Sequence, residues 1–337
     1  GASSRLGKGC FALPQLGGAL IIERNQQEEL MKKEKLYFDS TNGADRICYF
    51  KYSPETSPKA IFQMVHGMAE YAERYEALAA LLCEHGYVCY IHEHVGHGST
   101  AKDVDHLGLF LDDKQSVTLV EDTHKMSEIA KKENPALKLN LFGHSMGSFV
   151  VRLTAAKYGS DYNSLVICGT GAKDPKVPLG LAILKVLRLF RGKDFKSKFI
   201  DKSSFGSYND RFKPVRTPYD WVSVSKTNVD NYVASPYCGF LFSVDGYKML
   251  MEVNRDSNKP ETFKKTPSSL PIFLIAGGDD PVGHYGEDVP KVCEEYKAAG
   301  VADCTYKLYK GFRHEILLDD CAAEVRSDIL AFLERVS

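Results

Sequence analysis

The chain has 337 residues, of which 44% are hydrophobic and 26% are charged, a composition typical of a soluble globular protein. Its formal net charge of −1 argues against nucleic acid binding through an excess of positive charge. A chain of this length can bury a substantial core without disulfides or metals, either as two domains or as one α/β domain with an insertion.

The nine cysteines favour a reducing compartment. Their number is odd, none forms a CxxC pair, and Cys48, Cys89 and Cys168 lie inside apolar runs typical of strands. We interpret them as small buried hydrophobic residues and expect a cytoplasmic protein. No apolar run reaches the length of a membrane-spanning helix.

Residues 1–30 are expected to be an extension or an artificially added segment. The chain begins with glycine, whereas "MKKEKLYF" at Met31 resembles a natural start. The only apolar stretch in this segment is interrupted by Pro14 and by Gly17–Gly18, and no small-x-small cleavage site follows it. We therefore begin the prediction of the fold at Met31.

From Met31 onward, short apolar strands alternate with amphipathic helices. Two alternating runs, "EKLYFDS" and "RICYFKYS", are joined by "TNGAD", which predicts a hairpin because Asn-Gly tolerates positive φ. Further strands are predicted within 59–67, 87–98, 137–143, 163–171, 270–280 and 304–311, and helices at 73–86, 115–133, 289–299 and from about 320. This alternation predicts an α/β fold with a mostly parallel central sheet flanked by helices and an antiparallel hairpin at one edge.

The alternation stops between about Lys173 and Pro267. This segment contains an apolar helix-like run near Leu179–Phe190, a basic stretch and an aromatic-rich stretch. We therefore expect an α/β core at 31–172 and 268–337, with a mainly helical cap inserted at 173–267. The apolar run is expected to pack on the core; lining of an acyl pocket is the alternative.

The stretch "LKLNLFGHSMG" places Ser145 between two glycines where a predicted strand becomes a helix. Gly143 and Gly147 allow a sharp turn that exposes the serine hydroxyl above the sheet, next to a helix N-terminus. Such a serine needs a base and a group that orients the base. The pattern therefore predicts a nucleophile, and the alternative is an ordinary loop serine.

The partners that this chemistry requires follow in the order acid, then histidine. Asp279 and Asp280 follow one predicted strand and His314 follows the next, so both loops emerge at the sheet edge that carries Ser145. We prefer Asp280 to Asp279 because it reaches farther from the strand end. Backbone N–H groups of Met146 and Met68 are the expected donors to the oxyanion.

Five motifs together resemble the monoacylglycerol lipase / lysophospholipase group of α/β-hydrolases, also called serine aminopeptidase-like: "VHGMAEYAERY", "HEHVGHGST", "GHSMGS", "GGDDPVG" and "GFRHEILLD". The resemblance extends from about Lys35 to the C-terminus. It implies Ser145 as nucleophile, Asp280 and His314 as its partners, and the Met68 and Met146 amides as oxyanion donors.

The chain departs from the group's motifs at two loops. Ala69 and Tyr71 replace the glycine and histidine of H-G-x-G-E-H, and Glu93 replaces the usual aspartate of D-H-x-G-H-G. The first departure leaves the conformation of the oxyanion loop open, and no catalytic consequence is predicted for the second.

The predicted function is that of a serine hydrolase that cleaves carboxylic esters of acyl chains, such as monoacylglycerols or lysophospholipids, through a Ser-His-Asp triad and an acyl-enzyme. No cofactor or metal is expected, and contact with a membrane is expected at most peripherally through the cap. The alternatives are a serine aminopeptidase of the same fold, with Asp220, Asp230 and Glu252 as candidate groups for a substrate ammonium, and a small-molecule receptor without turnover. The spacing of His92, His94 and His97 invites a zinc site, but no cysteine or carboxylate cluster accompanies them.

Overall fold

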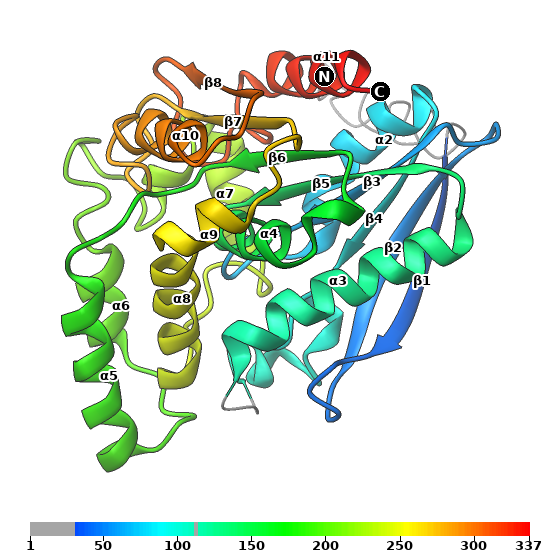
Figure 1. The fold of residues 1–337 in the computed structure, drawn as a ribbon. Helices are drawn as coiled ribbons and strands as arrows, with labels where there is room; N and C mark the ends of the chain where they lie inside the picture. The colour runs from blue at the N-terminus through cyan, green and yellow to red at the C-terminus, as the bar shows by residue number, and fades with distance from the viewer. Residues whose placement is uncertain (1–30, 111–113) are drawn as a thin grey trace, which may run out of the picture.

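The computed structural model describes residues 31–110 and 114–337. The predicted extension, residues 1–30, lies outside the described residues. Eight strands form one sheet in the order β1-β2-β4-β3-β5-β6-β7-β8 (Figure 1). The strands are β1 (Met31–Asp39), β2 (Arg46–Pro54), β3 (Ala60–Val65), β4 (Tyr87–His92), β5 (Lys138–His144), β6 (Ser164–Cys168), β7 (Ile272–Gly277) and β8 (Cys304–Tyr309).

The topology confirms the predicted α/β fold. β1 pairs with β2 and β2 with β4 in antiparallel fashion, and every other pairing in the sheet is parallel. The hairpin predicted from "TNGAD" is thus the antiparallel edge. The α-helices are α2 (Glu76–Glu84), α3 (Gln115–Glu133), α4 (Met146–Tyr158), α5 (Val177–Arg191), α6 (Lys198–Phe205), α7 (Lys226–Ala234), α8 (Val244–Ser257), α9 (Pro260–Lys265), α10 (Asp288–Ala298) and α11 (Ala322–Arg335).

Helices cover both faces of the sheet, which explains why the strands β3, β4, β6 and β7 are almost entirely buried. Successive strand residues point to opposite faces. In β3, Ile61 and Val65 belong to the apolar cluster that includes α3 and α4, whereas Phe62 and Met64 belong to the cluster that includes α2 and α11. The sheet is therefore the central layer of a three-layer arrangement (Figure 1).

The chain between β6 and β7 contains helices α5 to α9. Helix α8 packs beside both α4 and α5 (Figure 1). The expected packing of the apolar run on the core holds for Leu184, which is 2% exposed, but is wrong for Leu189 and Phe190, which are 80% and 77% exposed. The exact division between core and cap stays a prediction.

The parallel strands place the loops of interest at one edge of the sheet. The turn after β3 holds Met68, the turn after β5 holds Ser145, and the turns after β7 and β8 hold Asp280 and His314. The carboxyl ends of parallel strands share one edge, where α/β folds carry their sites. Within the described residues, no helix combines the length and apolar character needed to traverse a bilayer.

Candidate active site

Ser145 occupies a strained turn between β5 and α4. Its backbone has φ 54° and ψ −120°, a region that side-chain-bearing residues rarely adopt and that is enriched at functional sites. The flanking glycines are sterically required, because a β-carbon at Gly143 would lie 2.3 Å from the Gly147 carbonyl oxygen and one at Gly147 would lie 2.2 Å from that of Val65. The turn predicted from G-x-S-x-G is therefore present.

His314 and Asp280 form a buried pair. His314 Nδ1 lies 2.8 Å from Asp280 Oδ2, and the other Asp280 oxygen accepts the Val282 N–H at 2.9 Å. Asp280 is fully buried, whereas Asp279 is exposed and contributes its backbone N–H to the Phe312 carbonyl. Of the two aspartates, only Asp280 contacts the histidine in the described part of the chain.

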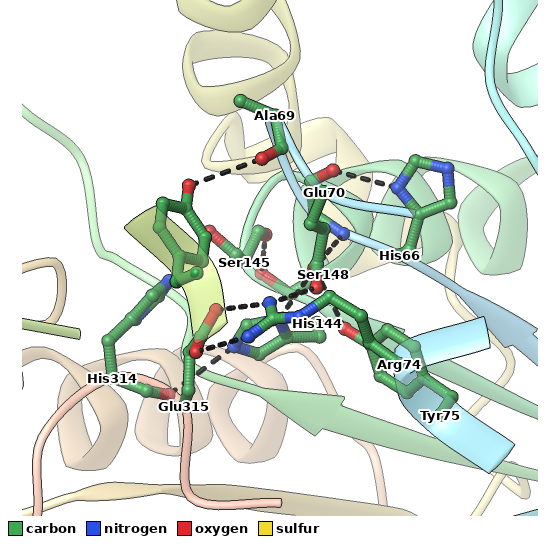
Figure 2. A network of polar contacts seen from close by, with 12 residues as sticks. His66, Ala69, Glu70, Arg74, Tyr75, His144, Ser145, Ser148, His314 and Glu315 are labelled. Carbon is green, nitrogen blue, oxygen red and sulfur yellow. Dashed lines mark hydrogen bonds and ion pairs between the residues drawn. The ribbon is translucent and has the colours of Figure 1, made fainter. Parts of the chain in front are cut away.

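Ser145 and His314 flank the same short segment at the end of β6. The Ser145 N–H donates to the Cys168 carbonyl at 2.9 Å, and a β-carbon at the next residue, Gly169, would lie 3.1 Å from His314 Cε1. Figure 2 shows both side chains in one small region. Within residues 31–110 and 114–337, no hydrogen bond joins the Ser145 hydroxyl to His314. The structure therefore brings Ser145 and His314 into one site, but their side chains are not hydrogen-bonded to each other.

The two expected oxyanion donors lie on either side of Ser145. Met146 is the first residue of α4, where backbone N–H groups have no intrahelical acceptor. The loop that carries Met68 passes closely over the serine, since a β-carbon at Gly67 would lie 2.9 Å from the Ser145 β-carbon. Among the described residues, neither the Met68 nor the Met146 amide has a hydrogen-bond acceptor in the chain.

Ala69 adopts a left-handed conformation with φ 50°. This is the position where the related motif has glycine. Alanine pays about 1–2 kcal/mol for this conformation, a cost that glycine avoids. The substitution noted in the sequence therefore preserves the turn but stores strain in the oxyanion loop.

Sequence reasoning missed a buried ionic network beside the serine (Figure 2). Arg74 contacts Glu70 at 3.0 Å and Glu315 at 2.5 Å and 2.7 Å. Glu70 also accepts the Gly67 N–H at 2.6 Å, which ties the network to the oxyanion loop. The four-residue spacing of Glu70 and Arg74 was a visible signal, but the role of Glu315 depends on the fold.

His144 belongs to this network. Its Nδ1 lies 3.1 Å from Glu70 Oε1 and its Nε2 lies 3.3 Å from the His314 carbonyl oxygen. Burial acts to lower the pKa of His144, but the hydrogen bond and charge of Glu70 outweigh it and raise that pKa. Burial likewise acts to raise the pKa of Glu70, yet the contact with His144 and the charge of Arg74 hold it well below its usual range. The charged pair therefore positions the backbone of His314.

Four buried histidines form a cluster in which neighbouring ring centroids lie 4.4 to 5.9 Å apart: His66, His92, His94 and His97. His66 and His94 are joined by the His94 N–H, which donates to His66 Nε2 at 3.1 Å, and by His94 Nε2, 3.1 Å from the His66 carbonyl. Burial lowers the pKa of His92 and of His97 to about 3. Within the described part of the chain, no group of three or more His, Cys, Asp or Glu residues is arranged to hold a metal ion.

Comparisons with known proteins match this chain to one family. The family model described as "Serine aminopeptidase, S33" matches residues 56–320. Monoglyceride lipase of Homo sapiens is 31% identical over 287 residues, which span 82% of this chain and 81% of that protein. Monoacylglycerol lipase of Mycolicibacterium smegmatis is 33% identical over 147 residues, which span 43% of this chain and only 50% of that protein.

Solved structures are similar over nearly the whole chain. A thermostable carboxyl esterase from Bacillus coagulans, in complex with glycerol, superposes with a TM-score of 0.85 at 33% identity, covering 91% of this chain and 99% of that one. A soluble variant of monoglyceride lipase from Saccharomyces cerevisiae, in complex with a substrate analog, has a TM-score of 0.70 over 91% of this chain and 96% of that one. At 17% identity, the second likeness supports the fold alone.

Proposed function

The chain belongs to the serine aminopeptidase S33 family of α/β-hydrolases and is a serine ester hydrolase, and we propose that it cleaves acyl esters through Ser145, His314 and Asp280. The family predicted from the sequence motifs is therefore confirmed. The observation that carries the proposed mechanism is the buried His314–Asp280 contact of 2.8 Å beside the strained turn of Ser145.

In the proposed mechanism, His314 Nε2 accepts the Ser145 proton as the serine oxygen attacks the ester carbonyl carbon. Asp280 accepts the hydrogen bond from Nδ1–H, which fixes the imidazole tautomer and stabilises the imidazolium. The Met68 and Met146 amides donate to the developing oxyanion. His314 then protonates the leaving alcohol, and water, activated by the same histidine, hydrolyses the acyl-enzyme.

The proposed substrates are esters with an apolar acyl chain, such as monoacylglycerols or lysophospholipids. Support comes from the relatives named monoacylglycerol or monoglyceride lipase. Trp221 belongs to the segment between β6 and β7, and its ring centroid lies 5.3 Å from that of His314. An aromatic side chain therefore adjoins the reacting groups. A cytoplasmic location is part of this proposal, supported by eight described cysteines that are all buried and free.

We further propose that α5 makes peripheral contact with a lipid surface. Its exposed apolar side chains include Leu179, Ile183, Val186, Leu189 and Phe190. The exposed basic residues Lys185, Arg191 and Lys198 lie on or beside this helix. An amphipathic helix with these features is suited to the interface of a membrane with anionic lipids.

The aminopeptidase alternative is disfavoured by the state of the three candidate carboxylates. Asp220 accepts backbone N–H groups of Arg216 and Thr217, Asp230 pairs with Arg216, and Glu252 pairs with Lys248. Each carboxylate is therefore already engaged, and binding a substrate ammonium would require breaking these contacts. The receptor alternative is disfavoured because binding without turnover requires neither a strained serine nor a buried His–Asp pair.

The test is hydrolysis of a p-nitrophenyl ester by paired variants. Ser145→Ala is expected to lower kcat by roughly 10⁴-fold while the thermal unfolding temperature stays within a few degrees. Asp280→Asn should lose a similar factor, because it stabilises the wrong imidazole tautomer, whereas the exposed Asp279→Asn serves as matched control and should retain parent activity. Parent-like turnover by Ser145→Ala would exclude the mechanism, and a large loss at Asp279→Asn alone would exclude the choice of acid.

A further inference from the structure

The strained residue Ala69 is held by hydrogen bonds on both sides of its backbone. Its N–H donates to His97 Nε2 at 3.2 Å. Its carbonyl oxygen accepts the Gly239 N–H at 2.9 Å and the Tyr232 hydroxyl at 3.2 Å. Figure 2 includes the contact with this carbonyl oxygen. A left-handed alanine is thus fixed by one group from the β4 loop and two from the segment between β6 and β7.

The His97 ring is oriented for this contact. Its Nδ1 lies 3.0 Å from the Val95 carbonyl oxygen, which assigns the proton to Nδ1 and leaves a lone pair on Nε2 for the Ala69 N–H. The buried ring makes edge-on contacts with three phenylalanines at centroid distances of 6.2, 5.2 and 5.3 Å, namely Phe110, Phe240 and Phe242. His97 is therefore a rigid acceptor in a single tautomer.

Met68, the proposed oxyanion donor, lies between two fixed points. Before it, the Gly67 N–H donates to Glu70 Oε1 at 2.6 Å, and after it, the Ala69 N–H donates to His97. Because Ala69 prefers negative φ, loss of the contact after Met68 would let the chain relax and rotate the Met68 peptide. Oxyanion donors act only when their N–H groups are aimed before the reaction.

We propose that His97 is a positioning residue that holds Ala69 in its left-handed conformation, assisted by Tyr232 and Gly239, and so aims the Met68 amide at the oxyanion. This inference rests on the proposed function, since it assumes that Met68 donates to the oxyanion. It also couples the segment between β6 and β7 to the rate of the chemical step.

Two substitutions at His97 separate positioning from packing. His97→Gln retains an acceptor oxygen at the end of the side chain but loses the ring, whereas His97→Phe retains the ring but loses the acceptor. We expect His97→Phe to lower kcat for a short p-nitrophenyl ester by about 10- to 100-fold with little change in KM, and His97→Gln to stay within about fivefold of the parent. Circular dichroism at the assay temperature checks that both variants are folded. A kcat for His97→Phe equal to or above that of His97→Gln would overturn the proposal.

The substitution Ala69→Gly provides a second test. It should restore kcat only if His97 acts by holding Ala69, and not if His97 merely packs in the core. Ala69→Gly removes the steric penalty of positive φ, so the loss in kcat caused by His97→Phe should be about fivefold or more smaller in the Ala69→Gly background than in the parent background. Tyr232→Phe removes only one hydroxyl, and its smaller loss in kcat should be rescued in the same way. If Ala69→Gly fails to rescue either variant, Ala69 strain is not what these groups control.

The control for a buried histidine is His92→Phe. His92 lies in the same cluster, but in the described part of the chain neither of its ring nitrogens has a hydrogen-bond partner, so the substitution should leave kcat unchanged. A loss like that of His97→Phe would assign the effect to the cluster in general and overturn the specific role of His97.

The Ser145→Ala variant in the same assay keeps the two proposals distinct. If hydrolysis persists without Ser145, the proposed function fails, whereas Ser145-dependent hydrolysis that is insensitive to His97→Phe excludes the positioning role alone.

Discussion

Helices α4 and α5 are both rich in apolar residues, yet they bury them to different degrees. In α4, Phe149, Val150 and Val151 are buried between the sheet and neighbouring helices. In α5, only Val177 and Leu184 are buried, and the remaining apolar side chains are half-buried or exposed. Contact with the sheet, and not apolar composition, therefore decides which side chains stabilise the fold.

The difference separates two kinds of function. The side of the molecule around α4 holds Ser145 and the buried ionic network, where each group depends on several others. The α5 side presents a surface whose residues have few partners within the chain. Substitutions on the first side should therefore cost stability or catalysis, whereas those at the exposed apolar side chains of α5 should affect only contacts with other molecules. The following predictions test this contrast in order of decreasing effect.

The largest effect on stability is expected at Arg74. Arg74→Met leaves Glu315 buried without its cation and removes one of the two cationic partners of Glu70, and breaking a buried ion pair in this way costs about 3–5 kcal/mol. Urea denaturation of the parent and the variant measures the change in the free energy of unfolding. Lys59→Met is the matched control, because Lys59 pairs with Glu334 where both side chains are nearly half exposed, and such pairs contribute about 0–1 kcal/mol. Equal losses from the two variants would contradict the contrast between buried and exposed charge.

A smaller effect is expected from the buried histidines at acidic pH. The pKa of His92 is about 3 in the folded protein because burial lowers it, whereas the ordinary value is 6.5. The unfolded chain therefore binds a proton that the folded chain does not between pH 6.5 and about 3, so the stability from this group is present above pH 6.5 and is lost as the pH falls.

His92→Phe removes this proton uptake. In the acidic range, the decrease in the free energy of unfolding should become shallower by about 1.4 kcal/mol per pH unit. Urea denaturation at several pH values between 7 and roughly 4 measures the slope. The exposed His85→Phe is the control for the loss of a histidine at the surface. An unchanged slope for His92→Phe would mean that His92 is protonated in the folded protein.

The sequence predicted the parts of this molecule that depend on local patterns. Alternation and apolar runs located the strands, and the helix predicted at 115–133 coincides with α3 (Gln115–Glu133). The turn around Ser145 followed from its two glycines, and the contact of Asp280 with His314 agrees with the preferred aspartate. The fit between Arg74 and Glu315 could not be predicted, because 241 positions separate them and only the fold brings them together.

The same limit applies to the oxyanion loop. The substitution of alanine for glycine at position 69 was visible in the sequence, but the groups that hold it were not. His97 lies 28 positions away and Tyr232 lies 163 positions away. The exposure of α5 was missed for a related reason. An apolar helical pattern indicates a face that is buried by something, but it does not indicate whether the same chain or another molecule buries it.

The smallest effect on stability is expected on the exposed face of α5. The double variant Leu189→Ser and Phe190→Ser should change the free energy of unfolding by less than about 0.5 kcal/mol, because both side chains already face solvent. Within the same helix, Leu184→Ser is the matched control and should cost about 2–5 kcal/mol, because Leu184 is buried.

If α5 contacts a lipid surface, the double variant should hydrolyse a short water-soluble ester at the parent rate but bind less to vesicles that contain anionic phospholipid. Parent-like vesicle binding would exclude α5 as the contact, and a large loss of stability would mean that the exposed face is covered within the chain.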